Sequence, residues 1–308
     1  MRFKRTMATA AIALAALALG ACGANSDPLG NTSAAPSGSA AAGGPVIVGS
    51  ANFTENQVLA ELYAQAMKAK GVDASTKLNI GSRELYIKAL QDGSISVMPE
   101  YTGNLLLYFD KSSKAKTAAD VESALPAAIG DLKLGTPSKA ADQDVYVVTK
   151  AYSDQNGITS LADLKKVSAD ATLGGPSELK DRAYGPAGLK SIYGATFKAF
   201  KPYDSPAVKV KDLNDNKIQV AEFFTTESAI VDNGYVPLED PESMILPQNV
   251  IPLVRSDVAD NANAVAALDA VQSALTTDDL VQLDKKVDSD RQDPAQVAGE
   301  WLKSKGLA

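Results

Sequence analysis

The stretch that decides the fold is VIVGSANFTENQVLAELYAQAM, residues 46–67. Its segment VIVGS over 46–50, which begins with three branched apolar residues, is typical of a short buried strand. Thr54, followed three residues later by Gln57, fits a capping box in which Thr54 is the N-cap. Apolar residues then recur at helical spacing, and Gly71 is the type of residue that ends a helix. The stretch therefore predicts a strand that leads directly into a helix.

The same alternation continues along the chain. A helix is expected near residues 83–91, between strands near 77–80 and 95–98. A second set of short elements follows it, with strands expected near 144–149, 172–174, 218–224 and 251–255, and helices near 160–166 and 188–193. Residues 258–307 show a helical period and predict a closing helical segment. This alternation is typical of an α/β fold with mostly parallel sheets.

The first 44 residues differ in composition from the rest. Three basic residues precede an apolar run over 8–19 that is too short to span a bilayer, so residues 1–21 are interpreted as a secretory signal. Cys22 closes the sequence LGAC, which looks like the lipobox of bacterial lipoproteins. That likeness implies a lipid on Cys22 and an extracytoplasmic protein anchored to the membrane. Residues 22–44 are rich in Gly, Ala, Ser and Pro and are expected to be a flexible tether.

Composition excludes several classes of function. Without residues 1–21 the chain has 27 basic and 37 acidic residues, a balance that disfavours nucleic-acid binding. The chain contains no histidine, which excludes Ser-His-Asp and Cys-His catalysis and disfavours a zinc enzyme. A single cysteine permits no internal disulfide. We therefore expect a binding protein and no enzyme, with no cofactor and no metal.

The most distinctive motif is PEYTGN, residues 99–104, which follows an apolar strand and precedes an apolar helix. In open α/β sheets, ligands bind where a strand ends and a helix begins. The alternative interpretation is a proline-containing turn with a packed tyrosine.

Three stretches together resemble the substrate-binding lipoproteins of osmoprotectant ABC transporters: GSANFTEN at 49–56, ALQDGSI at 89–95 and PEYTG at 99–103. The likeness extends to DVY at 144–146, RAYGPAGL at 182–189, TTE at 225–227 and PLVR at 252–255. Members of this family bind glycine betaine, carnitine, choline and related quaternary amines. The resemblance implies a monomer that works with an ABC permease and its ATPase.

The resemblance also implies a fold. This is the bilobal type II periplasmic-binding fold, in which two α/β lobes are joined by two crossing strands. The crossings are expected near 147–149 and 250–252. Lobe 1 would then contain residues 45–147 and 252–308, and lobe 2 residues 148–251.

The ligand class explains the binding residues that the resemblance implies. A trimethylammonium group cannot donate hydrogen bonds and is held by aromatic faces. Tyr101 matches the cage tyrosine of PEYTG, Tyr146 matches a crossover tyrosine, and Phe224 stands where another tyrosine is expected. Gln248 departs from an aromatic position of the family. The polar positions carried over from the family are Asn56, Asn104, Asp144, Arg182, which would grip a ligand carboxylate, and Tyr184. Phe53 and Tyr108 are assigned to packing.

Two other functions remain open. The incomplete cage favours, as an alternative, the same transport role with a different ligand, either aromatic or polyhydroxylated. A carboxylate-based envelope enzyme, such as a glycosidase that uses paired acidic residues, is the third possibility.

Overall fold

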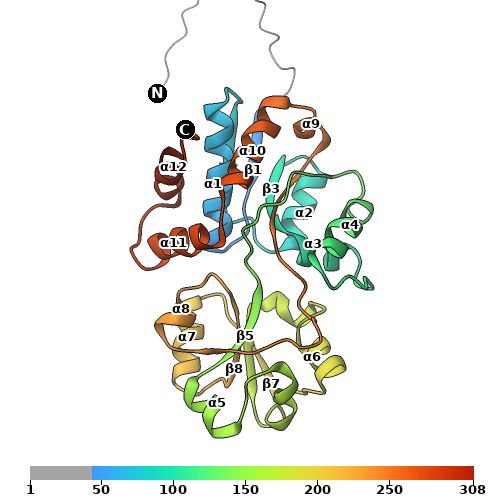
Figure 1. Ribbon diagram of the computed structural model, residues 1–308, viewed down its shortest axis with the longest axis vertical. Coiled ribbons are helices and arrows are strands. Elements are labelled where there is room, and N and C mark those ends of the chain that lie inside the picture. The colour runs from blue at the N-terminus through green and yellow to red at the C-terminus, as the bar shows by residue number, and fades with distance from the viewer. Residues whose placement is uncertain (1–43) are drawn as a thin grey trace, which may run out of the picture. The chain divides into compact units, whose positions relative to one another are not determined.

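The computed structural model describes residues 44–308. The expected signal, Cys22 and the tether up to residue 43 therefore lie outside the described residues. The described chain folds into two α/β lobes, each built around a five-stranded sheet (Figure 1). The α/β class and the two-lobed architecture expected from the sequence are confirmed.

The first lobe contains the two ends of the described chain. Its sheet has the order β2-β1-β3-β10-β4, in which β1 pairs parallel with its neighbours and β10 antiparallel with β3 and β4. The strands are β1 (Val46–Gly49), β2 (Ala74–Lys77), β3 (Val97–Tyr101), β4 (Lys133–Leu134) and β10 (Val250–Val254). The helices are α1 (Thr54–Ala69), α2 (Arg83–Gln91), α3 (Thr102–Phe109), α4 (Ala118–Ala128), α9 (Ser256–Ala259), α10 (Ala262–Ala274), α11 (Thr277–Asp288) and α12 (Pro294–Ser304).

The second lobe is formed by the middle of the chain. Its sheet has the order β7-β6-β8-β5-β9, in which β6 pairs parallel with β7 and β8, and β5 antiparallel with β8 and β9. The strands are β5 (Asp144–Val148), β6 (Thr172–Gly175), β7 (Ala199–Pro202), β8 (Val220–Phe224) and β9 (Val236–Pro237). The helices are α5 (Lys150–Asn156), α6 (Pro186–Tyr193), α7 (Pro206–Asn214) and α8 (Ala229–Asp232), with 3-10 turns η1 (Leu161–Lys166) and η2 (Ser177–Asp181). Both sheets are thus mixed, whereas mostly parallel sheets were expected.

The chain crosses between the lobes earlier than expected at each passage. It leaves the first sheet after β4 and enters the second at Asp144, so the first crossing spans 135–143 and not 147–149. It returns between Ile245, which packs in the second-lobe core, and Val250, which begins β10, and not over 250–252. The reason is that both apolar runs pair fully inside sheets: β5 with β8, and β10 with β3. The lobe limits at 147 and 252 therefore shift to these crossings.

The two crossings are hydrogen-bonded to each other. Ala141 and Asn249 form an antiparallel bridge, Ser138 N donates to Val250 O at 2.8 Å, and Asp142 N donates to Gln248 O at 3.2 Å. Such a paired connection leaves few residues in which the backbone can bend.

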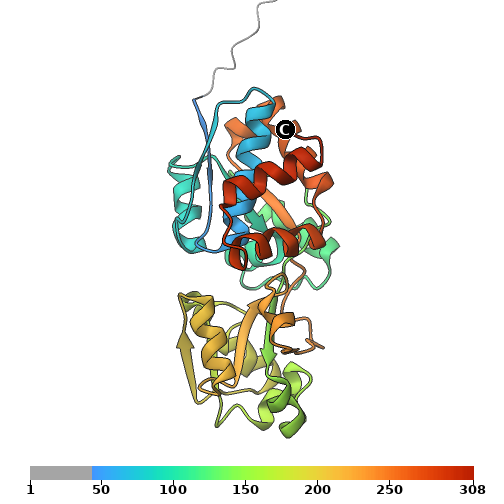
Figure 2. The same cartoon turned by 90° about the vertical axis from the view of Figure 1, so that its left-hand side faces the viewer.

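Helix α1 is the central helix of the first lobe. Leu59, Leu62 and Tyr63 are fully buried, and the Tyr63 hydroxyl donates to Gln272 Oε1 at 2.9 Å. Helices α10, α11 and α12 pack around it (Figure 2). The expected capping box at Thr54 is wrong. The N-cap is Phe53, without a side-chain cap, and Thr54 Oγ1 donates to Asp288 Oδ1 at 2.6 Å, so α11 takes the hydroxyl that a cap would use.

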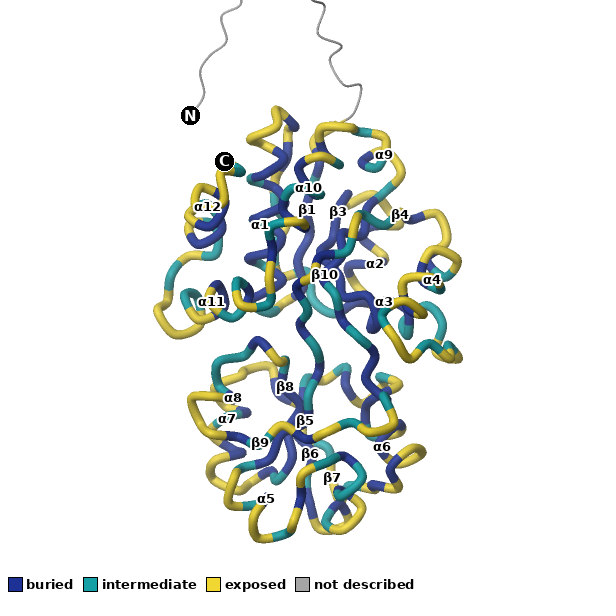
Figure 3. Tube along the Cα trace, viewed as in Figure 1, coloured by how far each residue is buried: buried dark blue, intermediate teal, exposed yellow. Residues whose placement is uncertain are grey.

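The central strands lie in the interior of each lobe, whereas the edge strands β2, β4, β7 and β9 are partly exposed, as are the outer helices and turns (Figure 3). Among residues 44–308, no helix combines the length and the apolar character needed to cross a membrane.

Candidate functional site

A cavity of about 310 Å³ is lined by residues of both lobes and of the first crossing. Its first-lobe side chains follow β1, β2 and β3 or come from α11, and its second-lobe side chains lie at the ends of β6, β7 and β8 or begin β5. Because β5 runs antiparallel to β8, the first residues of β5 lie beside the last residues of β8, at the same end of the sheet. The topology therefore gathers this lining at strand ends, where α/β sheets bind ligands.

Three aromatic rings in the cavity wall form what we call the aromatic cluster: Phe53, Tyr101 and Phe224. The rings of Phe53 and Phe224 stack across the two lobes, with centroids 5.2 Å apart and planes at 29°. Phe53 also lies 6.1 Å from Tyr101 between ring centroids. Phe53 was assigned to packing, but it lines the cavity. The cluster gives the cavity an apolar side that also attracts cations.

Buried carboxyl groups lie beside the aromatic cluster. The Tyr101 hydroxyl donates to Glu55 Oε1 at 2.6 Å, while Glu55 Oε2 has no partner. Burial raises the pKa of Glu55 from 4.5 to about 7. Burial and the charge of Glu55 also raise the pKa values of Asp142 and Asp284, and Asp284 Oδ1 is unpartnered. Asp142 Oδ1 accepts from Thr226 N at 3.1 Å, so the unpartnered oxygens of this group are Glu55 Oε2 and Asp284 Oδ1.

A second acidic group consists of Asp144 and Glu222. Asn104 Nδ2 donates to Asp144 Oδ2 at 2.6 Å, and the backbone N of Asn104 donates to Gln248 Oε1 at 2.9 Å. Asn104 Oδ1 and Glu222 Oε1 are buried and have no partner. Burial and the neighbouring Asp144 raise the pKa of Glu222 well above its usual range. The unpartnered atoms of this group are thus hydrogen-bond acceptors.

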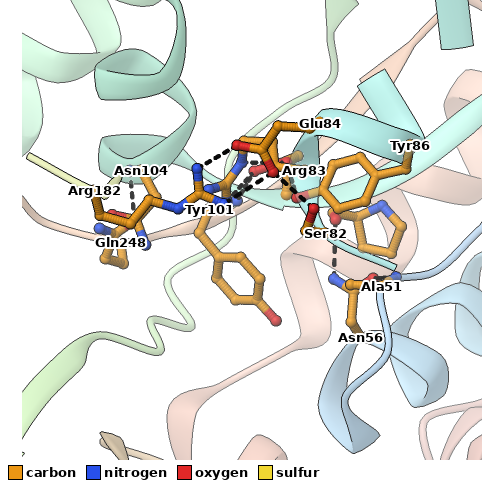
Figure 4. Close-up of polar contacts among 12 residues, drawn as sticks. Ala51, Asn56, Ser82, Arg83, Glu84, Tyr86, Tyr101, Asn104, Arg182 and Gln248 are labelled. Atoms are coloured by element: carbon orange, nitrogen blue, oxygen red, sulfur yellow. Dashed lines mark hydrogen bonds and ion pairs between the residues drawn. The ribbon is translucent and has the colours of Figure 1, made fainter. Parts of the chain in front are cut away.

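The cationic side chains of the lining are all paired. Arg83 holds Glu100 with two bonds of 2.9 and 3.0 Å. Arg182 Nη1 lies 2.5 Å from Glu84 Oε1, which joins the second lobe to the first (Figure 4). Lys209 Nζ donates to the backbone O of Glu222 at 2.8 Å and lies 3.5 Å from Glu227 Oε1. None of these groups in the described lining is free to meet an anion.

Six of the nine predicted binding residues line the cavity, namely Tyr101, Asn104, Asp144, Arg182, Tyr184 and Phe224. The structure places the other three behind its wall. Tyr146 is fully buried in the second-lobe core, and its hydroxyl donates to Tyr184 O at 2.7 Å. Tyr146 lies two residues further into β5 than Asp144, which keeps its ring away from the strand end that meets the cavity.

Asn56 and Gln248 hold the wall in place. Asn56 accepts from Ala51 N at 2.7 Å and donates to Pro99 O at 3.0 Å, and thereby ties the loop after β1 to β3 (Figure 4). Gln248 accepts the backbone N–H of Asn104 at the start of α3. Gln248 is not among the residues that line the cavity, and its Nε2 is buried without a partner.

Sequence reasoning missed the buried acidic side chains of the lining other than Asp144, namely Glu55, Asp142, Glu222 and Asp284. Two signals were present in the sequence. Glu55 belongs to the NFTE motif, and Glu222 is a carboxylate inside the otherwise apolar strand 220–224. Asp142 and Asp284 carry no local signal, since only the crossing and the packing of α11 bring them to Glu55. Within residues 44–308, no cluster of His, Cys, Asp or Glu is arranged to hold a metal ion.

Residues 44–304 match the family of the substrate-binding domain of ABC-type glycine betaine transport systems. The chain belongs to this family. Substrate-binding proteins of ABC importers are extracytoplasmic, and they deliver a small molecule to a permease and its ATPase. The family therefore provides the solute-binding role, and the cavity described above provides a site for it.

Two curated relatives and one solved structure illustrate the similarity. The chain is 25% identical over 282 residues to the glycine betaine-binding protein YehZ of Escherichia coli, covering 86% of this chain and 92% of the relative. It is 25% identical over 275 residues to a glycine-betaine-binding protein of Pseudomonas aeruginosa, covering 84% and 88%. A crystal structure of a glycine betaine/carnitine/choline ABC transporter protein superposes with a TM-score of 0.67 at 21% identity, over 85% of this chain and 99% of that one.

Proposed function

We propose that the chain is the solute receptor of an ABC importer, captures a quaternary-amine solute of the glycine betaine, choline and carnitine type, and catalyses no reaction. The observation that carries this proposal is the aromatic cluster beside buried carboxyl groups in one cavity. A trimethylammonium group offers methyl surface and a diffuse positive charge. Aromatic faces pack against the methyl surface, and carboxylates compensate the positive charge.

The binding free energy available from the aromatic cluster and its surroundings is large enough for a solute receptor. Micromolar binding requires about 8 kcal/mol. Aromatic faces contribute about 0.5–2 kcal/mol each to a bound cation, depending on its desolvation. Three rings therefore supply a substantial part, and methyl burial and the nearby carboxylates add to it.

Calorimetry with a panel of ligands tests the proposal. We expect saturable binding of choline or glycine betaine to the wild type and at least tenfold weaker binding to Phe224→Ala. Phe109→Ala, which removes a ring outside the cavity, is the matched control and should change the affinity less than twofold. Binding of small aromatic or polyhydroxylated compounds, without binding of any quaternary amine, would favour the alternative ligand class. Turnover of a bound ligand would contradict the receptor role.

We further propose that the receptor is a monomer tethered to the membrane through a lipid on Cys22. The LGAC motif and the tether composition of residues 23–44 support this, and residues up to 43 lie outside the described part of the chain. Mass spectrometry of the membrane-extracted protein should find a diacylglyceryl group on Cys22, and Cys22→Ala should abolish the anchoring. A mature protein that is released unmodified would contradict the anchor.

A further inference from the structure

The second acidic group has a chemistry that the aromatic cluster does not explain. A trimethylammonium group needs no hydrogen-bond partners, yet Glu222 Oε1 and Asn104 Oδ1 are buried acceptors without one. Both residues line the cavity and are less than a tenth exposed. Leaving such an atom unsatisfied destabilises the protein. A bound ligand that donates to them would remove this cost.

The orientation of the Asn104 amide follows from its neighbours. Its Nδ2 lies 2.6 Å from Asp144 Oδ2, an oxygen that accepts hydrogen bonds when the carboxylate is ionised. The amide oxygen is therefore the unpartnered atom. At Glu222, burial and the neighbouring Asp144 raise the pKa of the carboxyl group, and its Oε1 is buried without a partner.

A ligand carboxylate would find no partner at this end. The three cationic side chains of the lining, Arg83, Arg182 and Lys209, are already bonded to Glu100, Glu84 and the Glu222–Glu227 segment. Arg182 had been expected to grip a carboxylate, but its guanidinium instead joins the two lobes.

We propose that the ligand carries a hydrogen-bond donor, a hydroxyl or an amine, at the end that meets Glu222 and Asn104, and that the cavity disfavours a carboxylate there. This proposal rests on the proposed function, because it names which quaternary amines the receptor takes. It predicts net-cationic ligands of the amino-alcohol type ahead of zwitterions.

Calorimetry with four ligands of similar size tests the proposal. Choline, (2-aminoethyl)trimethylammonium, ethyltrimethylammonium and glycine betaine share the trimethylammonium group and differ at the other end. We expect the two donor-bearing cations to bind at least tenfold more tightly than glycine betaine. The affinity of ethyltrimethylammonium should lie between that of these two cations and that of glycine betaine. Glycine betaine binding as tightly as choline, or ethyltrimethylammonium matching choline, would overturn the inference and leave the receptor role intact. If none of the four binds, the proposed function fails as well.

Two variants locate the effect. Glu222→Gln places an amide donor where the acceptor lies and should narrow the choline-to-betaine affinity ratio at least threefold. Asp154→Asn, at an exposed acid of α5, is the control and should leave the ratio unchanged. Arg182→Gln should alter both affinities by the same factor. A selective loss of betaine binding in Arg182→Gln would show that Arg182 holds a carboxylate and would contradict the proposal. If a variant does not fold, the choline-to-betaine affinity ratio of the wild type still tests the proposal.

Discussion

At the scale of single residues, Glu55 links the site to pH. Its pKa is raised from 4.5 to about 7, mainly by burial, and the charge of Glu227 also raises it. The folded chain therefore keeps a proton between pH 4.5 and 7 that the unfolded chain has lost. The free energy of unfolding should fall as the pH rises through this window.

The variant Glu55→Gln tests this assignment. The amide keeps the shape and the acceptor for Tyr101 but cannot ionise, so the decline of stability between pH 4.5 and 7 should become shallower. Chemical denaturation at several pH values measures it, with Glu122→Gln on the exposed face of α4 as the control. An unchanged slope in Glu55→Gln would mean that Glu55 is already ionised in the folded protein.

Tyr146 gives a second test at this scale, because the structure moves it from the ligand to the core. Tyr146→Phe removes the hydroxyl that donates to Tyr184 O and leaves that buried carbonyl unpaired. We expect a loss of about 1–2 kcal/mol in unfolding free energy, with a smaller effect on ligand affinity than Phe224→Ala. Tyr152→Phe, at a partly exposed ring of α5, should be close to neutral. A large loss of ligand affinity in Tyr146→Phe without a loss of unfolding free energy would show that Tyr146 contacts the ligand.

At the scale of elements, α3 shows how the return crossing shapes the site. A Cβ on Gly103 would lie 2.6 Å from both Leu246 Cβ and Pro247 O, so the first turn of α3 presses on residues 246–248. Gly103→Ala should displace α3 and the Asn104 amide with it, at a cost of about 1–3 kcal/mol, and should weaken ligand binding. Gly299→Ala, in the interior of α12, should be neutral or slightly stabilising. Thermal unfolding and calorimetry of both variants provide the comparison, and an affinity unchanged in Gly103→Ala would contradict the role given to α3.

The elements also show what the sequence can predict. Helix α2 appears at its expected bounds, and β1, α1 and β5 lie within a few residues of theirs, because apolar periodicity is a local property. The crossings were displaced because an apolar run such as 144–148 predicts a strand without telling which sheet will bury it. The site follows the same rule. Tyr101 and Phe224 stand at strand ends that a motif marks, whereas Asp142 and Asp284 reach Glu55 only through tertiary packing.

At the scale of the whole molecule, the paired crossings are the expected hinge. Residues 138–142 and 248–250 are bonded to each other, while Phe53–Phe224 and Glu84–Arg182 join the lobes at the cavity. A ligand held by both lobes should stabilise one arrangement of them. Small-angle scattering should therefore show a smaller radius of gyration with saturating choline than without it, and identical profiles would contradict ligand-linked closure.

The central claim is that an organic cation binds between the lobes with its charged group against the aromatic cluster. A crystal structure of the protein grown with saturating choline tests it most directly. We predict the choline nitrogen within about 6 Å of at least two ring centroids among Phe53, Tyr101 and Phe224, and its hydroxyl donating to Glu222 Oε1 or Asn104 Oδ1. Choline bound outside this cavity, or bound in it with its charged group away from all three rings, would contradict the account.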